Sequence, residues 1–303
     1  MIVGLGELAG LGAALFWAVS SMIWGRIPLT ALGINLAKNV LGAAILFLHL
    51  LVLAIVLNRP LVAADIDSWK WLALSGLIGI ALGDTFYFRS LQTLGPRKSL
   101  MVASSAPIFA ALLNWWVLKN TVLPLGMLGI GLVILGVVLV VADRKAKKEF
   151  AHLQSGEYFR GIIFGILGAL CQALGLLFSQ FGMQNCGALE ASFIRILVSA
   201  TMIVCSYIAI GKFKPVAKKI IERKNIIWIL PATAMGTWLG IWFSQVAVKH
   251  ADLATAQTLM ATSPLFAIPM AILFYRERPT LVSFLGTVIG IAGIYFVVSN
   301  HMS

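Results

Sequence analysis

The stretch that decides the fold of this chain is residues 255–279, TAQTLMATSPLFAIPMAILFYRERP. It is apolar over about the 20 residues that an α-helix needs to cross a bilayer. Its first half nevertheless carries several hydroxyl side chains, and Pro264 and Pro269 follow within the apolar run. Proline inside a helix removes an i→i−4 hydrogen bond. We therefore predict a membrane helix that is broken at Pro264.

An earlier stretch, residues 104–110, repeats this plan as SSAPIFA, with Pro107 in the place of Pro264. The two prolines lie 157 positions apart. The same offset relates further pairs of residues along the chain: Lys38 and Arg195, Trp71 and Trp228, Gly79 and Gly236, Gly83 and Gly240, Phe86 and Phe243, Phe109 and Phe266, Gly129 and Gly286, and Gly136 and Gly293. Chance similarity between apolar helices does not hold one register over such a distance, so we infer an internal repeat.

The composition is that of an integral membrane protein, because 60% of the 303 residues are hydrophobic and only 11% are charged. The net charge of +12 comes from Lys and Arg in short loops between apolar segments, so we expect a lipid bilayer as partner and no nucleic acid. Cys171, Cys186 and Cys205 lack metal-ligand spacing and are expected to pack. No metal or cofactor is expected.

The chain is predicted to be all-α, with ten transmembrane helices. The apolar segments run over residues 5–25, 31–57, 69–93, 98–118, 122–142, 159–184, 189–211, 226–248, 253–275 and 280–299. This divides the chain into a first repeat (1–143), a basic loop (144–158) and a second repeat (159–303). Because each repeat holds an odd number of spans, the second must enter the membrane upside down relative to the first, which predicts inverted-topology repeats around a central cavity.

The loops after the odd-numbered spans hold 16 Lys and Arg residues, against 4 on the opposite side. The basic loops 144–158 and 212–225 account for most of this difference. The positive-inside rule then places these loops in the cytoplasm of a multi-pass inner or plasma membrane protein, with both termini outside the cytoplasm.

The charged residues that fall well inside predicted spans include Lys38, Asp84, Arg89 and Arg195. Unpaired charges at mid-membrane cost about 2.5–3.5 kcal/mol or more, so such residues face a bundle interior or a watery cavity. Asp84 and Arg89 lie about 140° apart around one helix, which makes their direct pairing imperfect. Asp84 either neutralises Lys38 or Arg89 structurally, or belongs to a polar set that lines a substrate or proton pathway.

Uncharged polar and aromatic residues supply the other cavity candidates. Trp238, Trp242 and Gln245 share one helix face by their i, i+4, i+7 spacing, which suits either a cavity for an organic substrate or ordinary packing. The remaining candidates are Ser105, Gln172, Gln180, Thr258 and Thr262. Interhelical hydrogen bonding, or bonding to the i−4 carbonyl, accounts for these equally well.

Taken with the repeat and the ten spans, Pro264, residues 276–280 (RERPT), Gly286, Gly290 and Gly293 resemble the EamA-type members of the drug/metabolite transporter superfamily. Arg195 is similar to the basic residue of the family's second helix, which Lys38 replaces in the first half. Asn120 stands where the family has the glutamate that matches Glu277.

The resemblance implies that spans 1–4 and 6–9 surround the cavity, that spans 5 and 10 are peripheral, and that the protein transports small organic molecules. It also implies cytoplasmic termini, the reverse of the Lys and Arg count.

The function we predict is secondary active export of a small organic metabolite such as an amino acid, by a monomer or homodimer. No nucleotide-binding loop is present, so a proton gradient or exchange would supply the energy, with Asp84 as the proton carrier. The alternative is a membrane scaffold or sensor without transport. We expect no catalytic residue, because Asp84 is the one aspartate well inside a span and hydrolase motifs are missing from the sequence.

Overall fold

A computed structural model describes residues 4–119, 124–141, 155–275 and 280–299, which are helical and contain no strand. The first half holds α1 (Leu5–Trp24), α2 (Ala31–Leu57), α3 (Ile66–Ser75), the π-helical segment η1 (Gly76–Leu82), α4 (Gly83–Ala103), α5 (Ala106–Trp116) and α6 (Pro124–Val141). The second half holds α8 (Ser155–Gly182), α9 (Ala188–Ala209), α10 (Phe213–Ile221), α11 (Arg223–Thr233), η2 (Ala234–Leu239), α12 (Gly240–His250), α13 (Leu253–Met260), α14 (Ser263–Tyr275) and α15 (Leu281–Ser299). Asn120, the motif 276–279 and most of the basic loop 144–158 lie outside the described residues.

Several helices begin at a side chain that caps free backbone N–H groups. The Thr30 hydroxyl accepts a hydrogen bond from the Gly33 N–H at 3.1 Å, and the Asp65 carboxylate accepts one from the Ser68 N–H at 2.7 Å. The Asp252 carboxylate accepts hydrogen bonds from the N–H groups of Ala254 and Thr255, at 3.0 and 3.1 Å. Ser, Thr and Asp favour this position because their short side chains reach the second or third N–H of the helix.

Six helical stretches are long and apolar enough to cross a membrane. They are residues 5–24, 31–57, 66–96, 156–182, 188–209 and 223–250. The prediction of a helical membrane protein is therefore confirmed. Three further stretches, within α5, α6 and α15, are apolar but shorter. The exact number of ten spans remains a prediction.

The predicted loop 212–225 differs from the structure, because it contains α10. The helix FKPVAKKII places its lysines on one side and its apolar residues toward α2, α9 and α11. Such an amphipathic pattern folds readily when one face can pack against a bundle.

The two halves of the chain are built from matching elements. α2 and α9 begin 157 positions apart, as do α3 and α11, and α4 and α12. The two π-helical segments both end at a leucine, Leu82 and Leu239, which are separated by the same offset. The internal repeat inferred from the sequence is thus confirmed at the level of secondary structure.

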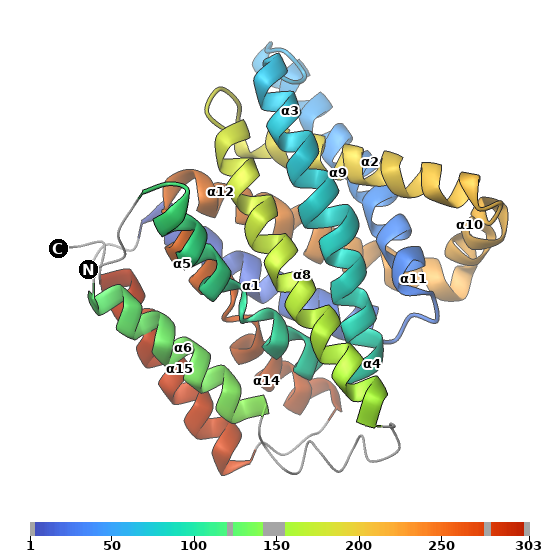
Figure 1. The fold of residues 1–303 in the computed structure, drawn as a ribbon. Helices are drawn as coiled ribbons and strands as arrows, with labels where there is room; N and C mark the ends of the chain where they lie inside the picture. Colours follow the sequence, from blue (N-terminus) through green and yellow to red (C-terminus); the bar gives the residue numbers. More distant parts are fainter. Residues whose placement is uncertain (1–3, 120–123, 142–154, 276–279, 300–303) are drawn as a thin grey trace.

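α6 and α15 pack mainly against each other, at one edge of the bundle (Figure 1). Their contact depends on glycine, because a Cβ added to Gly136 would lie 2.7 Å from the Gly290 nitrogen and 2.9 Å from its Cα. The two helix backbones therefore touch directly, as small residues permit in membrane proteins.

Each half also contains one helix that is interrupted before its end. α4 gives way to α5 at Ser104 and Ser105, and α13 gives way to α14 at Ala261 and Thr262. Pro107 and Pro264 lie in the first turn after each interruption, and not in mid-helix. Proline suits this position because the N–H it lacks would have no intrahelical acceptor there.

Candidate functional site

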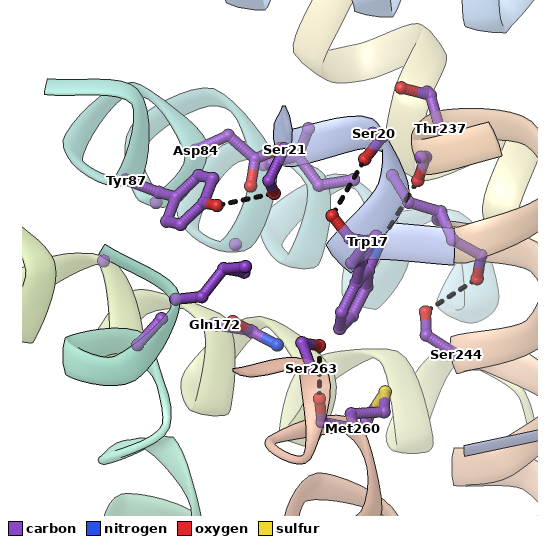
Figure 2. Close-up of a pocket in the computed structure, with 18 of the residues that line it drawn as sticks. Trp17, Ser20, Ser21, Asp84, Tyr87, Gln172, Thr237, Ser244, Met260 and Ser263 are labelled. Carbon is purple, nitrogen blue, oxygen red and sulfur yellow. Dashed lines mark hydrogen bonds between the residues drawn. The ribbon is translucent and has the colours of Figure 1, made fainter. Parts of the chain in front are cut away.

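A cavity of about 120 Å³ lies in the interior of the bundle, and elements from both halves line it. α1 contributes Trp17, Ser20, Ser21 and Trp24. Asp84 and Tyr87 of α4 and Gln172 of α8 also line the cavity, and Ser21 lies beside Tyr87 (Figure 2). The opposite wall comes from η2, α12 and α13 of the second half. Aromatic and aliphatic side chains thus surround a small number of polar groups, which is typical of sites for organic ligands.

Lys38 and Asp84 form an ion pair at the edge of this cavity, with 2.7 Å between Nζ and Oδ2. The Lys38 side chain is 5% exposed and that of Asp84 is 30% exposed. Of the two partners that the sequence left open for Asp84, the structure selects Lys38. Arg89, the other, is exposed on α4 and lies outside the cavity lining.

A chain of amides holds Lys38 in place. Lys38 Nζ donates to Asn39 Oδ1 at 2.9 Å, and Asn39 Nδ2 donates to Asn35 Oδ1 at 2.8 Å and to Ser199 Oγ at 2.9 Å. Asn35 Nδ2 in turn donates to the carbonyl oxygens of Ile80 and Ala81, both at 3.0 Å. The network ties the ammonium group of α2 to the backbone of η1 and to α9.

Both π-helical segments expose carbonyl groups that side chains from neighbouring helices satisfy. In η1 the donor is Asn35, and in η2 the Trp17 indole Nε1–H donates to the carbonyl oxygen of Gly236 at 3.1 Å. A π-helical segment carries one residue more than the regular helix and is frequent at functional sites. Here the two segments lie at matching positions of the repeats and both line the cavity.

Arg195, the residue of α9 that matches Lys38, also lines the cavity and is 4% exposed. Its Nε and Nη1 atoms have no hydrogen-bond partner within the parts of the chain that the structure describes. Glycines of η1 make room for it: a Cβ on Gly79 would lie 3.3 Å from Arg195 Nη2. Buried N–H groups are nearly always paired in proteins, so this guanidinium is an exception that needs an explanation.

Amide and hydroxyl groups complete the lining. Gln257 on α13 is 1% exposed, and its Oε1 lacks a hydrogen-bond partner among the described residues. The Ser21 and Tyr87 hydroxyls hydrogen-bond each other at 2.7 Å, and Ser263 donates to the carbonyl oxygen of Met260 at 2.8 Å (Figure 2). The cavity thus combines groups that are already paired with a few that are free to meet a ligand.

Four of the predicted cavity residues line the cavity: Lys38, Asp84, Gln172 and Arg195. Ser105, Thr258 and Thr262 instead donate to backbone carbonyl groups three or four residues earlier in the chain, and lie outside the lining. Gln180 lies in a second pocket.

The aromatic stripe Trp238, Trp242 and Gln245, which runs from η2 into α12, faces away from the cavity. Trp238 and Trp242 both contact the ring of His49 on α2, and Trp238 Nε1 donates to His49 Nδ1 at 3.2 Å. Gln245 accepts a hydrogen bond from Ser179. The neighbouring face, with Thr237, Ile241 and Ser244, lines the cavity instead.

The cavity residues of α1 are absent from the sequence-based candidates. Trp17, Ser21 and Trp24 have the same i, i+4, i+7 spacing as the stripe on η2 and α12. The spacing rule would therefore have identified these residues as candidates, but it could not show which of the two stripes faces the cavity. Tyr87 and Gln257 carry no comparable signal.

The second pocket, of about 540 Å³, lies at the end of the bundle that carries the start of α1 and the ends of α8 and α12. Its polar lining comprises Glu7, Gln180, Gln184, Lys249, His250 and Asp252. No cluster of three His, Cys, Asp or Glu side chains that could hold a metal occurs in the part of the chain that the structure describes.

The EamA-like transporter family model matches residues 4–142 and 159–299, once in each repeat. The chain belongs to the EamA-like transporter family. It is 27% identical over 293 residues to Protein LicB of Haemophilus influenzae, which covers 95% of this chain and 96% of LicB. An uncharacterized transporter of Archaeoglobus fulgidus is 23% identical over 273 residues, covering 89% of this chain and 90% of that one.

The fold of this EamA-like transporter also matches a solved crystal structure with a TM-score of 0.71. The match covers 98% of this chain and 96% of the other at 16% sequence identity, and it shows the fold alone. An uncharacterized transporter of Synechocystis is 23% identical over 241 residues, with 76% of this chain and 72% of the other covered. The chain is therefore a membrane transporter, and its cavity lies between the two family repeats.

Proposed function

We propose that this EamA-like transporter is a secondary active transporter that exports a small organic metabolite, such as an amino acid, by alternating access. The observation that carries the proposal is the Lys38–Asp84 pair, which borders a cavity lined by both repeats. Charged side chains inside membrane spans are costly and commonly mark a substrate or ion pathway. A site between two repeats lets one repeat move against the other around a bound substrate.

Buried and mostly apolar side chains lie between the two pockets, and this arrangement supports alternating access. On α1 the cavity residues begin at Trp17, whereas the buried Ala9 and Ala13 lie nearer the second pocket, which includes Glu7. On α8 and α12, buried apolar residues likewise lie between the residues that line the cavity and those that line the second pocket. These are Ala173, Leu177, Ala247 and Val248, which belong to one apolar cluster. We propose that separation of these side chains connects the cavity to the second pocket while its other end closes.

Asp84 is our candidate for a proton carrier. It is partly exposed, whereas its partner Lys38 is buried, so a proton can reach the carboxylate from the cavity. Protonation would release Lys38 and change the charge of the cavity, which is a means of coupling a proton to the transport cycle.

The coupling test uses Asp84→Asn, and Lys38→Met/Asp84→Asn as a partner variant that leaves no unpaired lysine. Both should fold and lose pH-dependent transport in proteoliposomes. Normal pH dependence in either variant would remove Asp84 from the mechanism.

The test of transport itself starts with thermal stabilisation of the purified protein by amino acids, nucleosides, sugars and organic cations at two pH values. A ligand that binds the folded state raises its melting temperature by mass action. A stabilising compound should then exchange across proteoliposomes that contain the protein. A folded protein that binds such a compound without exchanging it would favour the alternative, a membrane sensor or scaffold.

A further inference from the structure

The ionisable side chains in the cavity do not balance. Three charged side chains occur among the described lining residues: Lys38, Asp84 and Arg195. Lys38 and Asp84 neutralise each other across 2.7 Å, and Lys38 is further held by Asn39. One positive charge, that of Arg195, is left over. A cavity built this way favours a ligand that brings a negative charge.

Among the described residues, Asp84 is the one carboxylate in the cavity lining, and although it interacts electrostatically with Arg195, it is already paired with Lys38. The side chain is 4% exposed, and Nε and Nη1 lack an acceptor among the residues that the structure describes. A buried guanidinium with a purely structural role is normally paired or fully hydrogen-bonded, because its desolvation is otherwise uncompensated. A buried guanidinium with two donors that have no partner among the described residues, on a residue that lines the cavity, therefore points to an acceptor on the ligand.

The rest of the lining describes the remainder of that ligand. Trp17, Phe88, Leu100 and Met260 offer apolar surface. Gln257 presents a buried carboxamide whose Oε1 is free among the described residues, and it can pair with a hydroxyl or ammonium group of the ligand. The volume of about 120 Å³ limits the ligand to a small molecule.

We propose that the substrate of this transporter carries a carboxylate, and that Arg195 binds that carboxylate directly. The proposal rests on the proposed transport function and names its substrate class. Arginine suits the role because it is always charged and its planar N–H groups match the two oxygens of a carboxylate. A simple organic cation is disfavoured, since it would share the cavity with Arg195 while Asp84 is already paired.

The test compares small molecules of one shape and different charge. The probes are phenylacetate, phenylacetamide and phenethylammonium, with L-phenylalanine as a zwitterion and butyrate as a smaller anion, each at about 10 mM in thermal stabilisation of the full chain. Phenylacetate, butyrate or phenylalanine should stabilise the protein, and the amide and the ammonium compound should not. Phenylphosphonate serves to distinguish carboxylate binding from binding of any oxyanion.

Arg195→Met and Arg195→Lys test the residue, with Arg89→Met as the matched control from an exposed position in another span. Arg195→Met should weaken carboxylate binding by about tenfold or more, which corresponds to one charged hydrogen bond. Arg195→Lys should keep part of the binding, and Arg89→Met should bind normally.

A structural role for Arg195 makes a different prediction about the ligand-free protein. If the uncompensated cation serves only the ligand, Arg195→Met should melt at the same temperature as the parent chain or higher. A large fall in the melting temperature, with carboxylate binding unchanged, would overturn the proposal.

Other outcomes separate this proposal from the transport function. Stabilisation by the amide or ammonium probe alone, or by none of the carboxylates, would overturn the carboxylate assignment and leave transport open to other substrates. Stabilisation by phenylphosphonate that equals the stabilisation by phenylacetate would also overturn the carboxylate assignment, because the site would then bind any oxyanion. Carboxylate binding that depends on Arg195, without counterflow in proteoliposomes, would support the site and contradict transport.

Discussion

The Ser104 hydroxyl donates a hydrogen bond of 2.7 Å to the carbonyl oxygen of Ala261, and the two residues are 157 positions apart. They are equivalent positions of the two repeats, each at the point where a helix is interrupted. Both are buried, at 2% and 7% exposure. The interruption in one repeat thus satisfies a backbone group that the interruption in the other leaves free, which lipid could not do.

Ser104→Ala should destabilise the protein by about 1–3 kcal/mol, because it leaves the buried Ala261 carbonyl without this partner. The matched control is Ser105→Ala, since Ser105 donates to the Val102 carbonyl within its own turn. Its effect should be smaller. Chemical denaturation in detergent measures both, and equal effects would contradict a role for the contact between repeats.

Asp84→Asn and Lys38→Met should each destabilise the protein, and the double variant should be destabilised by less than the sum of the two single effects. Asp84→Asn leaves a buried ammonium group unpaired, which costs about 3 kcal/mol or more when the partner is truncated. The double variant removes both charges and should recover part of this loss. A double-mutant cycle measures the coupling, and strict additivity would show that the pair contributes nothing to stability.

Gly136→Ala should weaken the packing of α6 on α15 by about 1–3 kcal/mol, because the new methyl group has no room against the Gly290 backbone. Gly131 of the same helix offers the control, since a Cβ there meets no described atom within 4 Å. Gly131→Ala should be neutral or slightly stabilising. Carboxylate binding should survive both changes because the α6–α15 pair lies outside the cavity lining.

Cysteine labelling tests the proposed orientation. In a background without Cys171, Cys186 and Cys205, Lys214→Cys on α10 should resist a membrane-impermeant maleimide in intact cells and react in inverted vesicles. Asp67→Cys, at the start of α3 on the other side, should show the reverse. Both positions are exposed, so accessibility depends on the side of the membrane alone. The opposite pattern would place the basic loops outside the cytoplasm.

Asp65 should make stability depend on pH in the acid range. Hydrogen bonds from the Ser68 N–H and hydroxyl and from Asn185 Nδ2 lower the pKa of this carboxyl below its usual 3.8. A lowered pKa means that the stabilisation is present above the unfolded-state value and is lost as pH falls through the folded-state value. Asn185→Ala should therefore reduce stability at pH 6 and narrow the difference between pH 6 and pH 3, measured by thermal melting. Unchanged pH dependence would contradict the role of Asn185.

The sequence was sufficient for the class of protein and for its internal repeat. Apolar segments of bilayer length leave few alternatives, because the backbone must bond to itself in lipid. A single offset of 157, which holds from Lys38 to Gly136, predicts which elements of the first half match those of the second half. Charges within spans are so costly that Lys38, Asp84, Arg89 and Arg195 were all predicted to face the interior. The structure places Lys38, Asp84 and Arg195 in the cavity lining and leaves Arg89 exposed.

Only the tertiary structure decided which charged residues pair and which helix faces line the cavity. Asp84 had two cationic neighbours in sequence terms, and packing placed Lys38 beside it while Arg89 faces outward. The stripe on α1 and the stripe on η2 and α12 have the same spacing, yet only the first faces the cavity. A helical period shows which residues share a face, but it does not show which neighbouring helix that face contacts. The unpaired guanidinium of Arg195 is likewise a property of its surroundings, which no local pattern in the sequence encodes.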